Sequence, residues 1–117
     1  MMMKPYPLHI LREKTELIPH AVLSVSVWDI ANEFKFDIEK GEDDFDRYFG
    51  FGAISDFGYP FAIMHYRGYP ENTSTIYLPR DFGSDLKKIT EAVHSIATEL
   101  THSDKLLLWE RKDDPDL

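Results

Sequence analysis

The sequence predicts an α+β fold, a two-layer sandwich in which one long helix covers an antiparallel sheet of about four to six strands and is followed by a last strand. Two observations lead to this prediction. Apolar residues recur in steps of three and four between residues 85 and 100, and residues 45–78 fall into short apolar segments separated by glycine and proline. The length of 117 residues is typical of a single domain.

The helix is the element with the clearest pattern. At the start of the helix, the negative charge of Asp85 would interact favourably with the positive end of the helix dipole, and Ser84 is a candidate for capping the first turn. The predicted buried face consists of Leu86, Ile89, Ala92, Val93, Ile96, Ala97 and Leu100, and Lys87, Lys88, Glu91, Ser95, Thr98 and Glu99 fill the opposite side. Residues 106–110 are predicted to form the strand that returns to the sheet.

Four further strands are predicted before this helix. Residues 21–28 alternate apolar and polar side chains, and residues 48–55, 61–67 and 73–78 are short apolar segments bounded by turn residues. A meander is the simplest way to connect the last three, and Pro79 is expected to end the third of them. We expect residues 1–20 to form an N-terminal arm and residues 112–117 a frayed acidic tail.

Residues 27–38 fit two patterns. A helix would place Val27, Ile30, Ala31, Phe34 and Ile38 on one face. A strand over residues 33–39 would alternate Phe34, Phe36 and Ile38 with Lys35, Asp37 and Glu39. The strand is the favoured interpretation, and the helix remains its alternative.

Charge is the strongest guide to the kind of partner. The formal net charge is −8 and the pI is near 5.0, which disfavours nucleic acid because phosphate binding depends on Lys and Arg. Residues 29–47 contain eight acids and three bases, a net charge of −5. We therefore expect Asp43, Asp44 and Asp46 to face a basic protein partner.

The sequence predicts neither a cofactor nor a metal site. It contains no cysteine, and His94 and His102 are too far apart to ligate from one helical face. The acids of 42–46 lack the spacing of a calcium loop, and Gly50-Phe51-Gly52 is not followed by the helix of a dinucleotide site. The chain start resembles no export signal and no apolar run could span a bilayer, so a cytoplasmic location without membrane contact is expected.

The segment 65–69 offers the best alternative site. In a strand, His65 and Arg67 would share one face, where an imidazole beside a guanidinium could bind an anionic group, with Tyr48 as a further polar anchor. This would make the protein a small-molecule binder or an enzyme with a pocket. The competing structural explanation is that Arg67 pairs with a neighbouring acid.

The favoured hypothesis from the sequence is a protein-binding module that acts by surface complementarity and not by turnover. An immunity or antitoxin protein that masks a cationic nuclease would be a concrete example, because opposite charges speed and orient association. A homodimer formed through an exposed sheet edge or aromatic face is a further alternative.

Overall fold

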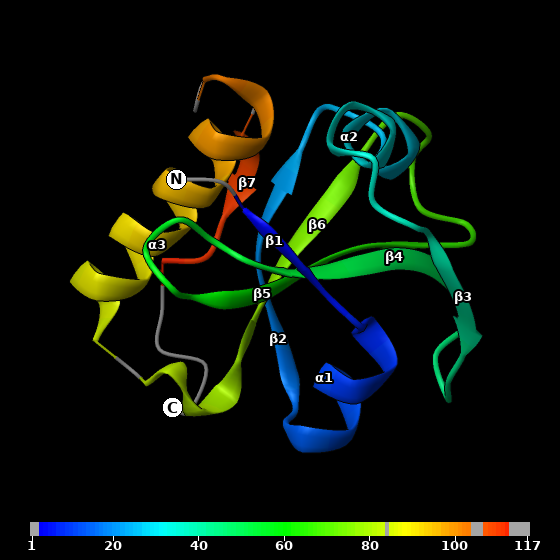
Figure 1. Ribbon diagram of the computed structural model, residues 1–117, viewed down its shortest axis with the longest axis horizontal. Coiled ribbons are helices and arrows are strands. Elements are labelled where there is room, and N and C mark those ends of the chain that lie inside the picture. The colour runs from blue at the N-terminus through cyan, green and yellow to red at the C-terminus, as the bar shows by residue number, and fades with distance from the viewer. Residues whose placement is uncertain (1–2, 84, 104–106, 113–117) are drawn as a thin grey trace.

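The computed structural model describes residues 3–83, 85–103 and 107–112 (Figure 1). Its elements are, in order, β1 (Lys4–Tyr6), α1 (Leu8–Lys14), β2 (Leu17–Leu23), α2 (Val27–Phe34), β3 (Glu39–Glu42), β4 (Arg47–Ile54), β5 (Pro60–Tyr66), β6 (Ser74–Pro79), the 3-10 helix η1 (Arg80–Phe82), α3 (Leu86–Thr101) and β7 (Leu107–Glu110). Among these helices, none is long and apolar enough to cross a membrane. The α+β class, the long C-terminal helix and the last strand are confirmed.

The strands of the described residues form one antiparallel sheet in the order β1-β4-β5-β6-β2-β7, with β3 also paired to β4. Strands β4 to β6 make the expected meander and β3 extends it, whereas β2 lies between β6 and β7. Strands β1 and β3 share one edge of β4, since β1 pairs near Gly52 and β3 near Tyr48. The sheet therefore has seven strands where four to six were expected, because the N-terminal residues contribute β1 and residues 39–42 contribute β3.

Each face of the sheet has its own apolar core. On one face α2 and α3 cover the larger core, to which the sheet contributes residues such as Phe51, Ile63 and Ile76. On the other face α1 covers a smaller one, which includes Met64 and Tyr77. Figure 1 shows α3 at the left of the view, α2 at the upper right and α1 at the bottom.

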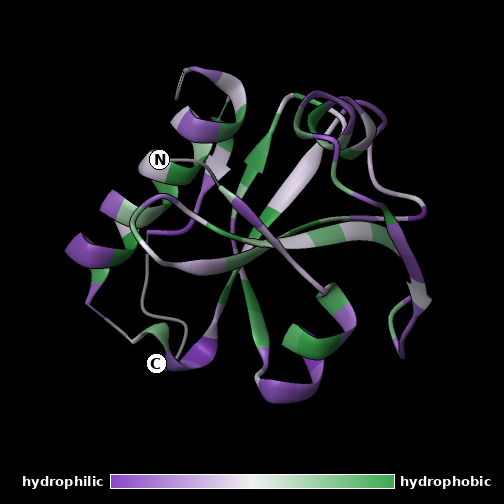
Figure 2. Cartoon of the chain, in the orientation of Figure 1, coloured by the Kyte–Doolittle hydropathy of each residue, from purple (hydrophilic) through white to green (hydrophobic). Residues whose placement is uncertain are grey.

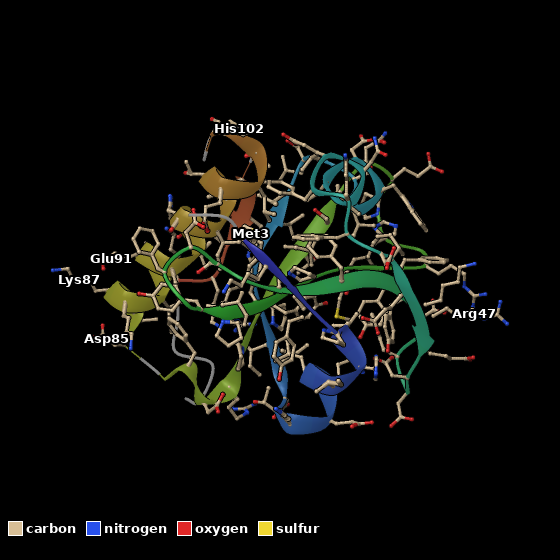
Figure 3. The ribbon with its side chains drawn as sticks, viewed as in Figure 1. Met3, Arg47, Asp85, Lys87, Glu91 and His102 are labelled. Atoms are coloured by element: carbon tan, nitrogen blue, oxygen red, sulfur yellow. The ribbon has the colours of Figure 1, made fainter. Side chains whose placement is uncertain are left out.

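Helix α3 matches its prediction closely. Asp85 is its N-cap and accepts hydrogen bonds from the backbone amides of Lys87 and Lys88, while the capping role expected of Ser84 lies outside the described residues. In Figure 2 the outer side of this helix is mostly purple, the colour of hydrophilic residues. Figure 3 shows Lys87 and Glu91 pointing away from the sheet. Leu86, expected in the core, is exposed because it lies in the first turn, at the margin of the sheet.

The interpretation of residues 33–39 as a strand is wrong, and so is the end of the strand predicted at 21–28. Strand β2 ends at Leu23, and residues 27–34 form α2, whose first turn is capped by the Ser26 hydroxyl accepting from the Asp29 amide at 3.0 Å. The helix buries Val27 and Ile30 almost completely. The Ser26 cap and the apolar residues at helical spacing after it therefore favour the helix more strongly than the alternation of residues 33–39 favours a strand.

The predicted N-terminal arm contains two elements that the sequence did not indicate, β1 and α1. Helix α1 has only two turns and begins after Pro7, which offers no capping side chain. Instead Glu39 of β3 accepts hydrogen bonds from the amides of Leu8 at 2.5 Å and His9 at 3.1 Å. The cap comes from 31 residues away in sequence, so no local pattern reveals it. Of the predicted acidic tail, residues 113–117 lie outside the described part of the chain.

Candidate functional site

The acidic turn between β3 and β4 is a cluster of hydrogen-bonded polar side chains. Asp43 lies at its centre, and its carboxylate accepts hydrogen bonds from Arg12 Nη2 at 2.9 Å and the Tyr66 hydroxyl at 2.5 Å. It also accepts from the backbone amides of Phe45 at 2.9 Å and Asp46 at 3.2 Å. Elements distant in sequence, α1 and β5, are thus joined through one carboxylate.

These contacts shift the pKa values of the groups that make them. Burial alone would raise the pKa of Asp43, but the hydrogen bonds from Tyr66 and Arg12 outweigh it and lower the pKa to about 2. Burial, together with donation to Asp43, raises the pKa of Tyr66 to about 12. At neutral pH the turn therefore contains a fully ionised carboxylate that its neighbours neutralise.

The other two aspartates of the turn differ from Asp43 and from each other. Asp46 pairs with Arg67 Nη2 at 2.9 Å and accepts from the Arg47 amide at 2.7 Å. Asp44 is exposed and makes no hydrogen bond or ion pair with any residue that the structure describes. Only one of the three predicted partner-binding acids is therefore free of an intramolecular partner, because the fold brings Arg12 and Arg67 to the other two.

Between these aspartates the turn presents an aromatic side chain. Phe45 is 64% exposed, and the edge of its ring contacts Tyr66 and Tyr69 at centroid distances of 4.9 and 5.9 Å. Tyr69, from the loop after β5, is also exposed. We call the surface formed by Asp44, Phe45 and Tyr69 the Phe45 patch. The sequence gives its residues but not their proximity, since 24 positions separate the two aromatic rings.

Tyr48 packs against the Tyr66 and Arg12 side chains that hold the acidic turn. Its ring packs against Tyr66 at 5.8 Å, and the Arg12 guanidinium lies 4.5 Å from its centroid. On its other side it lies against Gly41, where any side chain would collide with the ring. Tyr48 is thus a structural member of the turn and does not contact His65, with which the sequence analysis grouped it.

A cavity of about 250 Å³ lies beside the turn, on the α1 side of the sheet. Its polar groups include Arg12, Asp43 and Tyr66, which already bond to one another. Burial raises the pKa of Tyr77, the most deeply buried phenol in its wall. The cavity therefore offers a small molecule few polar groups without partners.

The sheet register separates the residues of the predicted anion site. Tyr48 pairs with Tyr66, and Phe49 with His65, so Tyr48 and His65 face opposite sides of the sheet. Arg67 lies beyond the end of β5 and binds Asp46. The structure therefore brings no guanidinium to His65 from this set, and the pairing of Arg67 with a neighbouring acid is the explanation that the contacts support.

His65 instead borders a second concavity, which we call the His65 pocket. It has a volume of about 280 Å³, and its lining residues are Ser26, Val27, Trp28, His65, Glu71, Asn72 and Thr73. His65 Nδ1 lies 3.0 Å from the Thr73 carbonyl oxygen, which can only accept, so Nδ1 carries the proton of the neutral ring. The Nε2 lone pair remains available as an acceptor.

A pair of carboxylates that the sequence did not reveal lies where the turn after β4 meets α3. Glu99 Oε1 accepts from the Asp56 amide at 2.7 Å, and burial together with Asp56 raises the pKa of Glu99. Asp56 Oδ1 and Glu99 Oε2 are buried and find no donor in the described part of the chain. Glu99 lies off the apolar face of α3, as expected, but it is half-buried because the turn folds over it.

The histidine within α3 and the histidine at its C-cap both have acidic partners. His94 Nε2 lies 2.9 Å from Glu110 of β7, and His102 Nε2 lies 2.8 Å from Glu33 of α2. Across the described residues, no three His, Asp or Glu side chains are grouped in a way that could hold a metal ion.

Comparisons of the chain with models of protein families, with curated proteins and with solved structures found no significant match.

Proposed function

We propose that this protein is a protein-binding module whose recognition surface is the Phe45 patch. The observation that supports the proposal is the combination of an exposed aromatic ring with a hydrogen-bonded turn backbone. Phe45 is 64% exposed, yet the residues on both sides of Asp44 and Phe45 are held by Arg12, Tyr66 and Arg67.

Such a turn is suited to binding because its order exists before the partner arrives. Association costs free energy when loops and side chains must be immobilised, and a preformed loop avoids much of that cost. The ring contacts with Tyr66 and Tyr69 also restrict Phe45 itself. A single exposed aromatic residue of this kind is a typical energetic centre of an interface.

Charge has a different part in the proposal. Because Asp43 and Asp46 have intramolecular partners, Asp44 is the acid of the turn that is free to meet a cation. The net charge of −8 acts over a longer range and favours a basic partner by accelerating encounter. We therefore assign affinity mainly to Phe45 and orientation mainly to charge.

The concrete form of the proposal is a cytoplasmic immunity or antitoxin protein that covers a cationic nuclease. A small, acidic, cysteine-free domain with a preformed recognition turn suits that role. In this form the domain needs no catalytic residues of its own, since covering the partner's surface is sufficient.

The test begins with the native partner, recovered by co-purification and identified by mass spectrometry. Affinity is then measured for the wild-type protein and for Phe45→Ala, with Phe57→Ala as the matched control, since Phe57 is 70% exposed in a different turn. We expect Phe45→Ala to raise Kd by about 30-fold or more, as for a hot-spot residue, and Phe57→Ala to leave it unchanged.

Two results would contradict the proposal. Equal effects of Phe45→Ala and Phe57→Ala would show that the patch is not the interface. A stable homodimer by light scattering that Phe45→Ala dissociates would assign the patch to a second copy of this chain instead of a basic partner.

A further inference from the structure

The His65 pocket lies beside the Phe45 patch, on the other side of one loop. The loop between β5 and β6 contributes Tyr69 to the patch and Glu71, Asn72 and Thr73 to the pocket. Figure 1 shows this loop running next to α2, whose start supplies Ser26, Val27 and Trp28 to the pocket, while β5 supplies His65. A partner that covers the patch would therefore be close to the pocket as well.

The only formally charged residue that lines the pocket is an acid, Glu71, whereas Ser26, Asn72 and Thr73 are neutral and can both donate and accept. His65 Nε2 has a lone pair, because Nδ1 donates to the Thr73 carbonyl. Glu71 is exposed and has no hydrogen-bond or ion-pair partner within the described residues. None of the lining residues is a lysine or arginine, and nearby Arg67 is bound to Asp46. The charge of the lining, one carboxylate and no basic side chain, therefore favours a cation over an anion.

An aromatic wall adds to this preference. Trp28 is 48% exposed, and its indole packs against Phe49 at a centroid distance of 5.2 Å, so the ring is supported while part of it faces solvent. The face of an indole attracts cations more strongly than other aromatic side chains do. A cation in the pocket would meet an indole, a carboxylate and an imidazole lone pair.

The volume limits the size of the ligand. At about 280 Å³ the pocket is smaller than the roughly 300 to 1,000 Å³ that usually enclose a whole small molecule. It is suited to the end of one side chain. Within the proposed function, the side chain that combines a compact cation with a long apolar stem is lysine.

We propose that the His65 pocket binds an alkylammonium group, and that a lysine side chain of the basic partner supplies it. This inference rests on the proposed function for the source of the ammonium group, whereas the preference for a cation follows from the pocket itself. It replaces the anionic ligand that the sequence suggested for His65.

The experiment titrates the full-length protein, labelled with ¹⁵N, with Nα-acetyl-lysine methylamide and with its uncharged norleucine analogue. The indole N–H of Trp28 reports on the pocket, and that of Trp109, which lies on β7, is the internal control. We expect the lysine probe alone to shift the Trp28 signal, in the millimolar range, and to leave Trp109 unchanged.

Variants assign the binding energy. Glu71→Gln and Trp28→Leu should each weaken the lysine probe by about three- to fivefold, the effect expected for one ion pair or one cation–π contact near the surface. Glu91→Gln is the matched control, because it removes the same charge from the outer side of α3 (Figure 3). Unchanged resonances elsewhere in the spectrum show that each variant is folded.

The outcomes separate this inference from the proposed function. Equal shifts with the lysine and norleucine probes, or equal affinities of Glu71→Gln and Glu91→Gln, overturn the pocket even if Phe45→Ala abolishes partner binding. Binding of the lysine probe with no effect of Phe45→Ala overturns the patch and leaves the pocket in place. If free n-pentylamine binds more strongly than the lysine probe, lysine is not the source of the ammonium group.

Discussion

Two carboxylate sites of this protein show opposite outcomes of burial. Asp43 receives four hydrogen bonds, two from side chains and two from backbone amides, and its pKa falls to about 2. Glu99 receives one, from the Asp56 amide, which does not offset burial and the nearby Asp56 carboxylate, so its pKa rises. Burial raises the pKa at both sites, and the number of donors determines whether the net shift is downward, as for Asp43, or upward, as for Glu99.

The largest effect is expected from removing the carboxylate that has many donors. Asp43→Ala should lower the free energy of unfolding by about 2 to 4 kcal/mol, because Arg12 and Tyr66 are left with their hydrogen bonds unmade in a half-buried site. Urea denaturation followed by circular dichroism measures the change. Asp44→Ala, in the same turn but exposed, should change it by no more than about 0.5 kcal/mol. Similar losses in both variants would show that the network is unimportant.

The same site predicts how stability responds to acid. The pKa of Asp43 is lower in the folded protein than its ordinary value of 3.8, so the ionised carboxylate stabilises the fold above pH 3.8. This contribution, about 2 kcal/mol, is lost as the pH falls from 3.8 through about 2. Asp43→Asn should lack this part of the pH dependence. Parallel stability curves for wild type and Asp43→Asn between pH 5 and 2 would contradict it.

At Glu99, which has few hydrogen-bond donors, the contribution to stability should change with pH in the opposite direction. Because the pKa of folded Glu99 is above its ordinary value of 4.5, its contribution to stability is complete below pH 4.5 and is lost as the pH rises through the folded pKa. Glu99→Gln cannot ionise and can donate to Asp56 Oδ1, so it should stabilise the protein at pH 8 by about 1 kcal/mol.

Thermal unfolding at pH 4 and pH 8 measures this difference. The gain from Glu99→Gln should be larger at pH 8 than at pH 4, and Glu91→Gln, on the exposed side of the same helix, should show neither effect (Figure 3). A loss of stability at pH 8 in Glu99→Gln would mean that the ionised pair is favourable.

The difference between these sites also explains what the sequence could predict. Helix α3 follows from local periodicity, because it buries one regular face, and strands β4 to β6 follow from short apolar segments bounded by turn residues, because the sheet is covered on both faces. The cap of α1 by Glu39 and the binding of Asp43 to Arg12 and Tyr66 each join residues more than 20 positions apart. Pairings of this kind depend on the order of strands in the sheet. No local pattern in the sequence indicates that order, such as the position of β2 between β6 and β7.

The candidate site divides in the same way. Asp43, Asp44 and Asp46 could be singled out by charge, but which of them is free depends on where Arg12 and Arg67 end up in the fold. His65 could be singled out by type, but its face of the sheet opposes that of Tyr48 because their cross-strand partners are adjacent residues. The sequence thus supplies candidates, and tertiary structure assigns their partners.

The smallest effect is expected from the second ion pair of the acidic turn. Arg67 binds Asp46 at 2.9 Å, the same length as the bond between Arg12 and Asp43, but the Arg67 side chain is 62% exposed and that of Arg12 is 28% exposed. Water can replace Asp46 as the partner of Arg67. Arg67→Ala should therefore cost about 0.5 kcal/mol or less, measured by urea denaturation.

Arg12→Ala should cost several times more, since it also removes the contact with the Tyr48 ring and leaves Asp43 without a cation. The contrast uses two arginines with identical bond lengths to aspartates of one turn, so bond geometry is held constant while exposure changes. Equal losses in the two variants would mean that exposure does not control the strength of these pairs. The turn would then owe its order to both arginines equally, and Arg67→Ala should weaken partner binding as much as Arg12→Ala.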